Sequence, residues 1–174
     1  RNNNELVAIF GNFINRVVVL INKYWEGVVP NCNTLDDYDK EVLEKLKEFP
    51  KKIGASIEKY RFREALAEFM KLARLGNKYL ADTEPWKLKK TDESRTETIM
   101  NIAMQIAASL AILSEPFMPF ASSKLKNILA LKEVRWSDAG EITIMENHKI
   151  NKAIHLFEKI EDEKIEEQRA KLKA

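Results

Sequence analysis

Apolar residues recur every three or four positions along most of this chain, and this spacing places them on one side of an α-helix. The first such segment runs from Asn3 to Trp25 and ends at Gly27 and Pro30. The pattern therefore predicts a helix that buries one stripe of side chains in a core. The positions of that stripe are Leu6, Ile9, Phe10, Phe13, Val17, Leu20 and Tyr24.

Two further helices follow a polar connector, residues 31–40. We expect Thr34 or Asp36 to cap the second helix, and Pro50 to interrupt or kink it. The third helix ends at the segment ADTEPW, residues 81–86. The apolar positions are Val42, Leu46, Phe49, Ile53 and Ile57 in the second helix and Phe62, Leu66, Phe69, Met70, Ala73 and Leu80 in the third.

A fourth helix follows Asp92, which is expected to cap it. Its apolar positions cover so wide an arc that this helix should lie at the centre of a bundle and be the most buried. Pro116 ends it, and a fifth helix runs from about Pro119 to Leu131. The apolar positions of the fourth helix are Ile99, Ile102, Ala103, Ile106, Leu110, Ile112 and Leu113.

Beyond Trp136 the helical spacing breaks up. Gly140 and the alternating Ile142 and Ile144 permit short extended segments but no large sheet. A charged helix with few apolar positions begins near Lys159, and such a helix is marginal when it packs against nothing.

These patterns predict an all-α fold in two parts. Residues 1–135 are expected to form a five-helix bundle. Residues 136–174 are expected to form a short irregular or small β connector and a C-terminal helix, which packs on the bundle or leads to a further module. Because the chain begins at Arg1 rather than Met and ends in a helical pattern, we also expect it to be a fragment.

Length and charge limit the choice of function only slightly. A chain of 174 residues suits one well-buried core, and 45% apolar with 32% charged residues is ordinary for a globular protein. The net charge is +2, from 29 Lys and Arg against 27 Asp and Glu. Any contact with a nucleic acid must therefore come from a local arrangement of charge.

The compartment is suggested by the single cysteine, Cys32, which excludes an internal disulfide and favours a reducing, cytosolic setting. No apolar run approaches the roughly 18 residues that span a bilayer, and no signal-peptide pattern opens the chain. We expect a soluble cytoplasmic protein with no membrane partner.

Sequence motifs of catalysis and metal binding are missing. There is no Gly-rich phosphate loop, no nucleophile elbow and no His-Glu-x-x-His zinc helix. The spacing of His148 and His155 fits no common zinc pattern, and we expect His148 to hydrogen-bond within the C-terminal connector. The sequence predicts no catalytic residue, metal site or cofactor site in this chain.

Polar side chains on the first helix form one candidate binding surface. At about 100° per residue, Asn12, Arg16 and Lys23 share a face beside the apolar stripe. An amide four residues before a guanidinium suits the edges of unpaired bases or a phosphate. A solvated flank of the bundle, with a hydrogen bond to another helix, is the alternative interpretation.

The segment EPWKLKK, residues 84–90, forms a second candidate surface, in which Trp86 follows Pro85. An aromatic face can stack on a splayed base while nearby ammonium groups hold phosphates. A Trp86 buried as a plug at the base of the bundle is the alternative. The lysines of this segment are Lys87, Lys89 and Lys90.

Four segments together resemble one protein family. They are NNNELVAIFGNFINRVVVLINKYWEGVVP, ADTEPWKLKKTD, LSEPFMPFASSKL and HKINKAIHLFEKIED. The sequence is similar across nearly its whole length to the anticodon-binding domain of methionyl-tRNA synthetases, a helical bundle that follows the catalytic domain of these class I enzymes. The most specific feature is the joint presence of the Asn-x-x-x-Arg helix and the Pro-Trp turn.

The resemblance implies roles for the residues of both surfaces. Asn12, Arg16 and Trp86 would read the CAU anticodon, by base stacking on the indole and by hydrogen bonds to base edges. Pro85 would shape the turn, and Lys23 would assist binding. Lys87, Lys89 and Lys90 would hold phosphates.

The resemblance also implies an ATP-dependent parent enzyme that attaches methionine to elongator and initiator tRNA. The partners would be methionine tRNA and the parent's own catalytic domain; zinc in that domain and a homodimeric parent are compatible with the resemblance. Motifs like His-Ile-Gly-His and Lys-Met-Ser-Lys-Ser are missing from this sequence. The chain alone is therefore expected to be inactive and to bind no cofactor.

Two other functions are compatible with a helical bundle. One is the anticodon-binding domain of a different class I synthetase, which the paired Asn-Arg and Pro-Trp features fit less well. The other is a helical protein-interaction module with no role in RNA binding, in which Asn12 and Arg16 would contact a partner helix.

Overall fold

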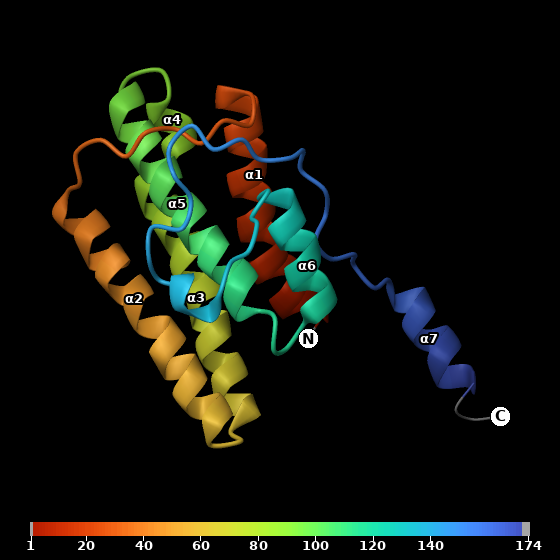
Figure 1. The fold of residues 1–174 in the computed structure, drawn as a ribbon. Helices are drawn as coiled ribbons and strands as arrows, with labels where there is room; N and C mark the ends of the chain where they lie inside the picture. The colour runs from red at the N-terminus through yellow and green to blue at the C-terminus, as the bar shows by residue number, and fades with distance from the viewer. Residues whose placement is uncertain (1, 172–174) are drawn as a thin grey trace.

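A long first helix opens the structure, a computed structural model that describes residues 2–171 (Figure 1). It begins as a π-helix, Asn2–Gly11 (η1), and continues as an α-helix, Asn12–Trp25 (α1). The predicted helix is confirmed, but only Phe10, Phe13 and Val17 of the predicted stripe are buried, and its other positions are partly exposed. The remaining buried side chains of this helix are Ile14, Val18 and Ile21.

The other predicted helices of the bundle also form, with an additional short helix after the third. The third predicted helix ends at Thr83, and the Pro-Trp turn forms the first residues of that short helix. The fifth predicted helix ends slightly earlier than expected. The bounds are Asp37–Glu58 (α2), Phe62–Thr83 (α3), Pro85–Leu88 (α4), Glu93–Leu113 (α5) and Pro119–Ile128 (α6).

The helix α5 lies at the centre of the bundle, as predicted. Every residue from Thr98 to Leu113 is buried, and the helix contacts α1, α2, α3, α4 and α6. A helix that is apolar nearly all round leaves the least apolar surface exposed to water when it lies at the centre. The helices that surround α5 in Figure 1 are α1, α2, α3, α4 and α6.

Two helix starts follow the predicted capping chemistry. The Asp36 side chain accepts from the Asp39 backbone N–H at 2.8 Å, and the Asp39 side chain accepts in return from the Asp36 N–H at 3.1 Å. Asp92 accepts from the backbone N–H of Arg95 at 2.9 Å. Of the two predicted caps for α2, Asp36 is therefore the one used.

Pro50 lies inside α2 and does not end it. We expected Pro50 either to interrupt the helix or to kink it, and the interruption is wrong. Leu46 and Ile53, on either side of Pro50, are both buried in the core. Their packing offsets the lost backbone hydrogen bond, because tertiary contacts supply most of the stability of a helix in a folded protein.

The connector after α6 crosses the bundle without forming a sheet within residues 2–171. It contains a short 3₁₀ turn, Trp136–Asp138 (η2), and one antiparallel bridge between Val28 and Lys149. The side chain of Gln105 on α5 also holds it, since its amide oxygen accepts from Thr143 N and Ile144 N at 2.9 and 3.0 Å. Its amide nitrogen donates to Ile144 O at 2.7 Å.

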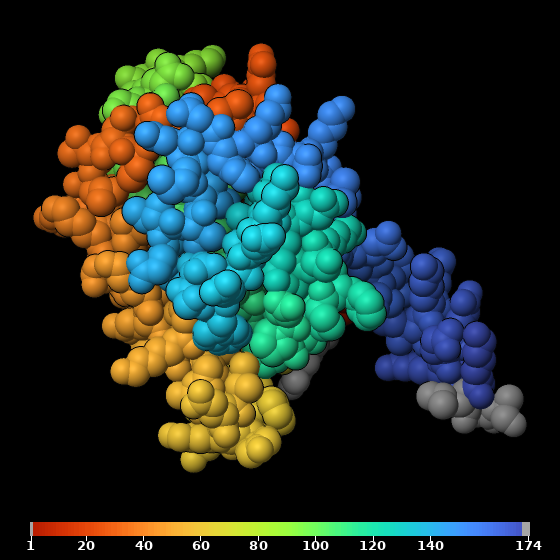
Figure 2. Space-filling view, in the orientation of Figure 1, coloured from red at the N-terminus to blue at the C-terminus, as the bar shows by residue number. Residues whose placement is uncertain are grey.

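The final helix, Asp162–Lys171 (α7), stands apart from the bundle (Figures 1 and 2). Every residue from 158 to 171 is exposed. This agrees with the low apolar content of the segment, because a helix without an apolar stripe gains little by packing.

Contrary to the expectation from the sequence, two helical segments, Asn2–Trp25 and α5, are long and apolar enough to cross a membrane by length and composition alone. The core helix of a globular bundle meets the same criterion, and 94% of the relevant part of α5 is buried by the rest of the protein. The burial of α5 explains its apolar composition without a membrane.

Candidate nucleic-acid interface

The joint between α3 and α4 sets the position of the Pro-Trp turn. Glu84 is the single residue between the two helices, and it adopts a left-handed conformation with φ 43° and ψ 54°. Pro85 then occupies the first position of α4 and is buried. A proline suits this position because its fixed φ is helical and its missing N–H would have no partner there.

Trp86 lies directly beneath Arg16. The guanidinium carbon is 4.8 Å from the centroid of the indole ring, and both side chains are partly buried. Trp86 packs against the hydrophobic core and keeps part of its surface exposed to solvent. The two surfaces inferred separately from the sequence meet at this contact.

Asn12 and Arg16 have no hydrogen-bond or ion-pair partner among residues 2–171, and the same holds for Asn15 between them. Other amides nearby are engaged: Asn22 donates to Val18 O at 2.9 Å, and Asn77 donates to Ile9 O at 2.8 Å. Asn12, Asn15 and Arg16 therefore present unused donors and acceptors on one helix. Their lack of partners could not be read from the sequence.

The lysines around Trp86 differ in what they contact. Lys87 pairs with Glu84 at 2.8 Å. Lys89 pairs with Glu93, and its ammonium lies 4.4 Å from the ring centroid of Trp25. These neighbouring carboxylates neutralise much of the positive charge of both lysines.

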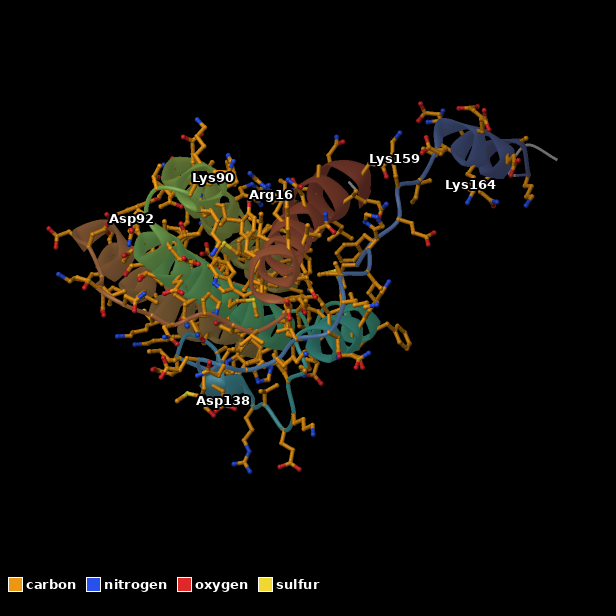
Figure 3. The ribbon with its side chains drawn as sticks, turned by 90° about the horizontal axis from the view of Figure 1, so that it is seen from above. Arg16, Lys90, Asp92, Asp138, Lys159 and Lys164 are labelled. Atoms are coloured by element: carbon orange, nitrogen blue, oxygen red, sulfur yellow. The ribbon has the colours of Figure 1, made fainter. Side chains whose placement is uncertain are left out.

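Lys90 and Lys23 are the more available cations of the site. Both are exposed, and neither has a carboxylate within 4.0 Å among residues 2–171. Lys23 lies over the ring of Tyr24 at 5.6 Å. Figure 3 shows Lys90 and Arg16 at the same edge of the molecule.

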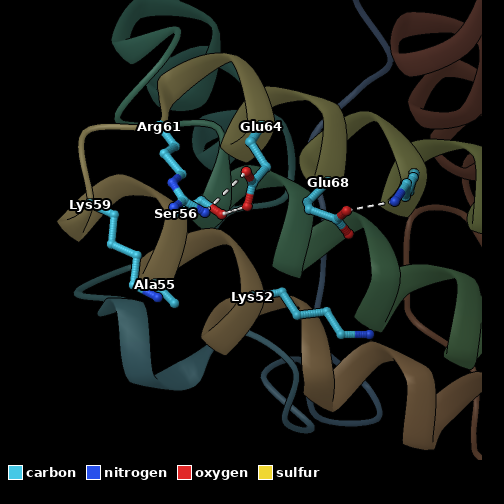
Figure 4. A pocket seen from close by; sticks show the side chains of 8 residues that line it. Lys52, Ala55, Ser56, Lys59, Arg61, Glu64 and Glu68 are labelled. Carbon is cyan, nitrogen blue, oxygen red and sulfur yellow. Dashed lines mark hydrogen bonds and ion pairs between the residues drawn. The ribbon is translucent and has the colours of Figure 1, made fainter.

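A different pocket, of about 310 Å³, lies between the ends of α2 and α3 (Figure 4). Its polar groups are bonded to one another: Ser56 donates to Glu64 at 2.8 Å, and Arg61 lies 3.7 Å from the same carboxylate. Because few of its groups remain unpaired, this pocket is a weaker candidate for ligand binding than the surface around Trp86.

The structure offers no clustered metal ligands within residues 2–171. The ring of His148 lies 2.8 Å from the carbonyl oxygen of Leu129. The expectation that His148 bonds within the connector is therefore wrong. It ties the connector to the end of α6, whose last carbonyl groups have no partner inside the helix.

A buried carboxylate, Asp39, takes part in a hydrogen-bond network inside the bundle. Asp39 is completely buried and accepts from Arg95 Nη2 at 2.9 Å and from the Tyr79 hydroxyl at 2.7 Å. Burial by itself would raise the pKa of Asp39, but the hydrogen bonds from Arg95 and Tyr79 outweigh it and hold that pKa below its ordinary value. This network joins α2, α3 and α5.

Comparison with sequence families gives one match. The sequence model for the anticodon binding domain of methionyl tRNA ligase matches residues 29–174. Among curated proteins, the methionine–tRNA ligases of Christiangramia forsetii and Cytophaga hutchinsonii are each 57% identical to this chain, over 100% and 99% of its length. The chain spans about a quarter of these relatives, 26% and 25% of their lengths.

Solved structures give a similar fold. The methionyl-tRNA synthetase of Mycobacterium tuberculosis in complex with methionyl-adenylate superposes with a TM-score of 0.86 at 22% identity, covering 91% of this chain and 32% of that one. Its apo form gives a TM-score of 0.87 at 21% identity, covering 92% and 34%. At this identity the likeness establishes the fold, an all-α bundle.

Proposed function

Since this chain belongs to the family of anticodon-binding domains of methionyl-tRNA ligases, we propose that it recognises the CAU anticodon of methionine tRNA. The proposed surface consists of Trp86, Arg16 and Asn12, which we call the reading surface. We further propose that the chain is one part of a longer methionine–tRNA ligase, as its coverage of the relatives suggests.

One observation carries the proposal: the Arg16 guanidinium lies 4.8 Å from the indole centroid of Trp86. A flat aromatic ring with a planar cation above it matches the way unpaired RNA bases are bound, by stacking and by hydrogen bonds to their edges. A base can take the place of the guanidinium on the ring, or stack on the guanidinium plane. The contact between ring and cation is worth about 0.5–2 kcal/mol, which a stacked base, worth about 1–3 kcal/mol, can replace.

Asn12 and Arg16 supply the proposed base-edge contacts. They are four residues apart on one helix, so their side chains are neighbours. An amide offers both donors and an acceptor, while a guanidinium offers only donors. Among the described residues, neither has a hydrogen bond or an ion pair that would have to be broken first.

The lysines and Pro85 are proposed to act around this surface. Pro85 is buried and would orient Trp86 from below. Lys90 and Lys23 would attract the phosphate backbone most strongly, because Lys87 and Lys89 already face Glu84 and Glu93. The resulting part of the affinity would weaken as the salt concentration rises.

The activity of the whole protein is part of the same proposal. The related proteins are methionine–tRNA ligases, and we propose that the longer parent attaches methionine to tRNA with ATP in the cytoplasm. In that parent, this chain would select the tRNA through its anticodon, and another part would hold the chemistry.

Binding of short RNA hairpins tests the proposal. The 174-residue chain is expected to bind a hairpin with a CAU loop more tightly than the same hairpin with a different anticodon, at one fixed ionic strength. The Trp86→Ala chain should lose most of this binding, since each stacked base is worth about 1–3 kcal/mol. Fluorescence anisotropy of labelled hairpins gives the affinities, and equal affinity for both hairpins would reject CAU recognition.

Trp136→Ala is the matched control for this variant. Trp136 is also partly buried, but it lies beside Gly54 of α2, away from the reading surface. Both substitutions should cost less stability than the about 3–5 kcal/mol of a fully buried tryptophan. Only Trp86→Ala should weaken RNA binding; a similar loss from Trp136→Ala would attribute the effect to stability.

A further inference from the structure

A second hollow shares Asn12 with the reading surface but is not lined by Arg16 or Trp86. It has a volume of about 380 Å³ and lies between the first helix and the C-terminal connector. Ala8, Asn12 and Asn15 line it from the helix, and His155 and Phe157 line it from the connector. This volume falls at the small end of the range of ligand pockets in proteins.

The lining combines flat, apolar and polar groups. Phe157 and Ala8 provide apolar surface, and the exposed ring of His155 provides a second aromatic face. The side-chain amides of Asn12 and Asn15 have no hydrogen-bond partner among residues 2–171, so the donors and acceptors of both are free to bind a ligand. Stacking surfaces beside free amides are the groups that bind a single unpaired nucleobase.

The connector wall is held in place by contacts at both ends. Asn3 donates to the carbonyl of Ile160 at 2.7 Å, and Lys124 of α6 donates to the carbonyl of His155 at 2.6 Å. The Phe157 ring packs on the buried ring of Phe10, with centroids 5.4 Å apart. The hollow is therefore a formed part of the fold.

Close approach of the two walls depends on a glycine. A Cβ at Gly11 would lie 3.3 Å from the Phe157 ring and 3.0 Å from the carbonyl oxygen of Leu6. A larger residue here would push the connector outward. The absence of a side chain at this point lets Phe157 close the bottom of the hollow.

We propose that this hollow binds a second unpaired base of the same anticodon loop, next to the base on Trp86. The proposal rests on the proposed function and extends it to Asn15 and the connector. Asn12 belongs to both the reading surface and the hollow. An RNA loop that contacts one of them therefore lies at the edge of the other. Neighbouring bases of a splayed loop would then both lie next to the Asn12 side chain.

Filling the hollow tests the proposal without touching the reading surface. Ala8 is exposed, so Ala8→Trp places a ring in the hollow and leaves the core unchanged. This variant should bind the CAU hairpin roughly tenfold or more weakly, the scale of one lost stacking contact. Ala67→Trp, at an exposed position on α3, is the matched control and should bind like the unmodified chain.

Asn15→Ala provides a second, milder test. Loss of one hydrogen bond to a base should weaken binding about threefold to tenfold. If Ala8→Trp and Asn15→Ala both bind within about twofold of the unmodified chain, the hollow does not take a base. The proposed function survives that result as long as the unmodified chain still prefers CAU and Trp86→Ala binds much more weakly.

Abasic hairpins identify the bound nucleotide. Each loop nucleotide is replaced in turn by an abasic site, and binding is measured with the unmodified and the Ala8→Trp chains. At one loop position, the abasic site should weaken binding to the unmodified chain but have little further effect on binding to Ala8→Trp. Two changes that remove the same contact are not additive. With Trp86→Ala a different position should show this behaviour. Full additivity at every position would overturn the proposal.

Discussion

Asp39 combines complete burial with a charge, which few carboxylates in the chain do. It is 0% exposed and accepts hydrogen bonds from Arg95, from the Tyr79 hydroxyl and from the Asp36 backbone. Its pKa lies below the ordinary value in the folded protein because these donors outweigh the effect of burial. The same interactions raise the pKa of Tyr79, through burial first and then its bond to Asp39.

The lowered pKa of Asp39 predicts a loss of stability in acid. The folded protein binds a proton at Asp39 less readily than the unfolded chain, whose pKa is about 3.9. The contribution of Asp39 is therefore complete at pH values well above about 4 and is lost as the pH falls through the lower folded value. Urea unfolding at about pH 7 and about pH 3 measures this difference.

The Asp39→Asn chain should be destabilised by about 3–5 kcal/mol near neutral pH, because it breaks a buried ion pair with Arg95. It should also lose part of the difference between neutral and acid stability. Asp37→Asn is the control, since that side chain is fully exposed two residues away. An acid sensitivity that is the same in Asp39→Asn and in the unmodified chain would contradict the role given to Asp39.

At the level of single residues, some features of the candidate site were predictable from the sequence and others were not. Asn12, Arg16 and Trp86 were predicted as candidate site residues because their residue types are unusual beside an apolar stripe and at a turn. The stacking of Arg16 over Trp86 could not be foreseen, since 70 positions separate them and only the packing of α4 on the bundle brings them together. The role of Asp39 was also missed, because its buried position depends on three helices.

Among the helices, α5 holds part of the connector after α6 in place. Gln105 lies in its buried centre and makes hydrogen bonds to Thr143 and Ile144 of the connector. These bonds take the place of the missing strand partner for this extended segment. The polar Gln105 in this apolar helix is therefore explained by the backbone groups of Thr143 and Ile144, to which it supplies hydrogen-bond partners.

Gln105→Leu is expected to loosen the connector and destabilise the fold by more than about 2 kcal/mol, since each buried backbone group left unpaired costs about 1–3 kcal/mol. Hydrogen exchange of residues 140–150 and the melting temperature measure the effect. Gln168→Leu on the exposed α7 is the control and should change neither. Unchanged protection of the connector in Gln105→Leu would show that other contacts hold it.

The helices themselves were largely predictable, because their periodicity and their capping residues agree. The bounds of α2 follow from the cap at Asp36, and the burial of α5 follows from its wide apolar arc. The π-helical start of the first helix and the continuation of α2 through Pro50 were not predictable. Both depend on how the helix packs, which spacing along the chain does not contain.

For the molecule as a whole, the charge balance matters more than any single cation. The net charge is +2, and two of the four lysines around Trp86, Lys87 and Lys89, face a carboxylate. A weakly charged protein should attract RNA only over short distances, so binding should have a shallow dependence on salt. The few cations without a carboxylate partner would set that dependence.

Lys90→Ala is expected to lower the salt dependence of hairpin binding by about one phosphate contact, a change of about 0.7 in the slope of log affinity against log salt for a single strand. The accompanying loss of affinity should be the same for the CAU hairpin and for hairpins with other anticodons. Lys51→Ala is the control, because Lys51 is also exposed but lies on α2. Equal slopes for the Lys90→Ala and unmodified chains would exclude a phosphate contact at this position.

The single left-handed residue between α3 and α4 has a consequence for how this protein can change in evolution. Glu84 alone fixes the direction in which α4 leaves α3. One extra residue at this joint would turn Trp86 by about 100° around the helix axis, away from Arg16. Insertions and deletions at this point should therefore be tolerated far less than substitutions, and the length of this junction should be kept wherever the same RNA must be chosen.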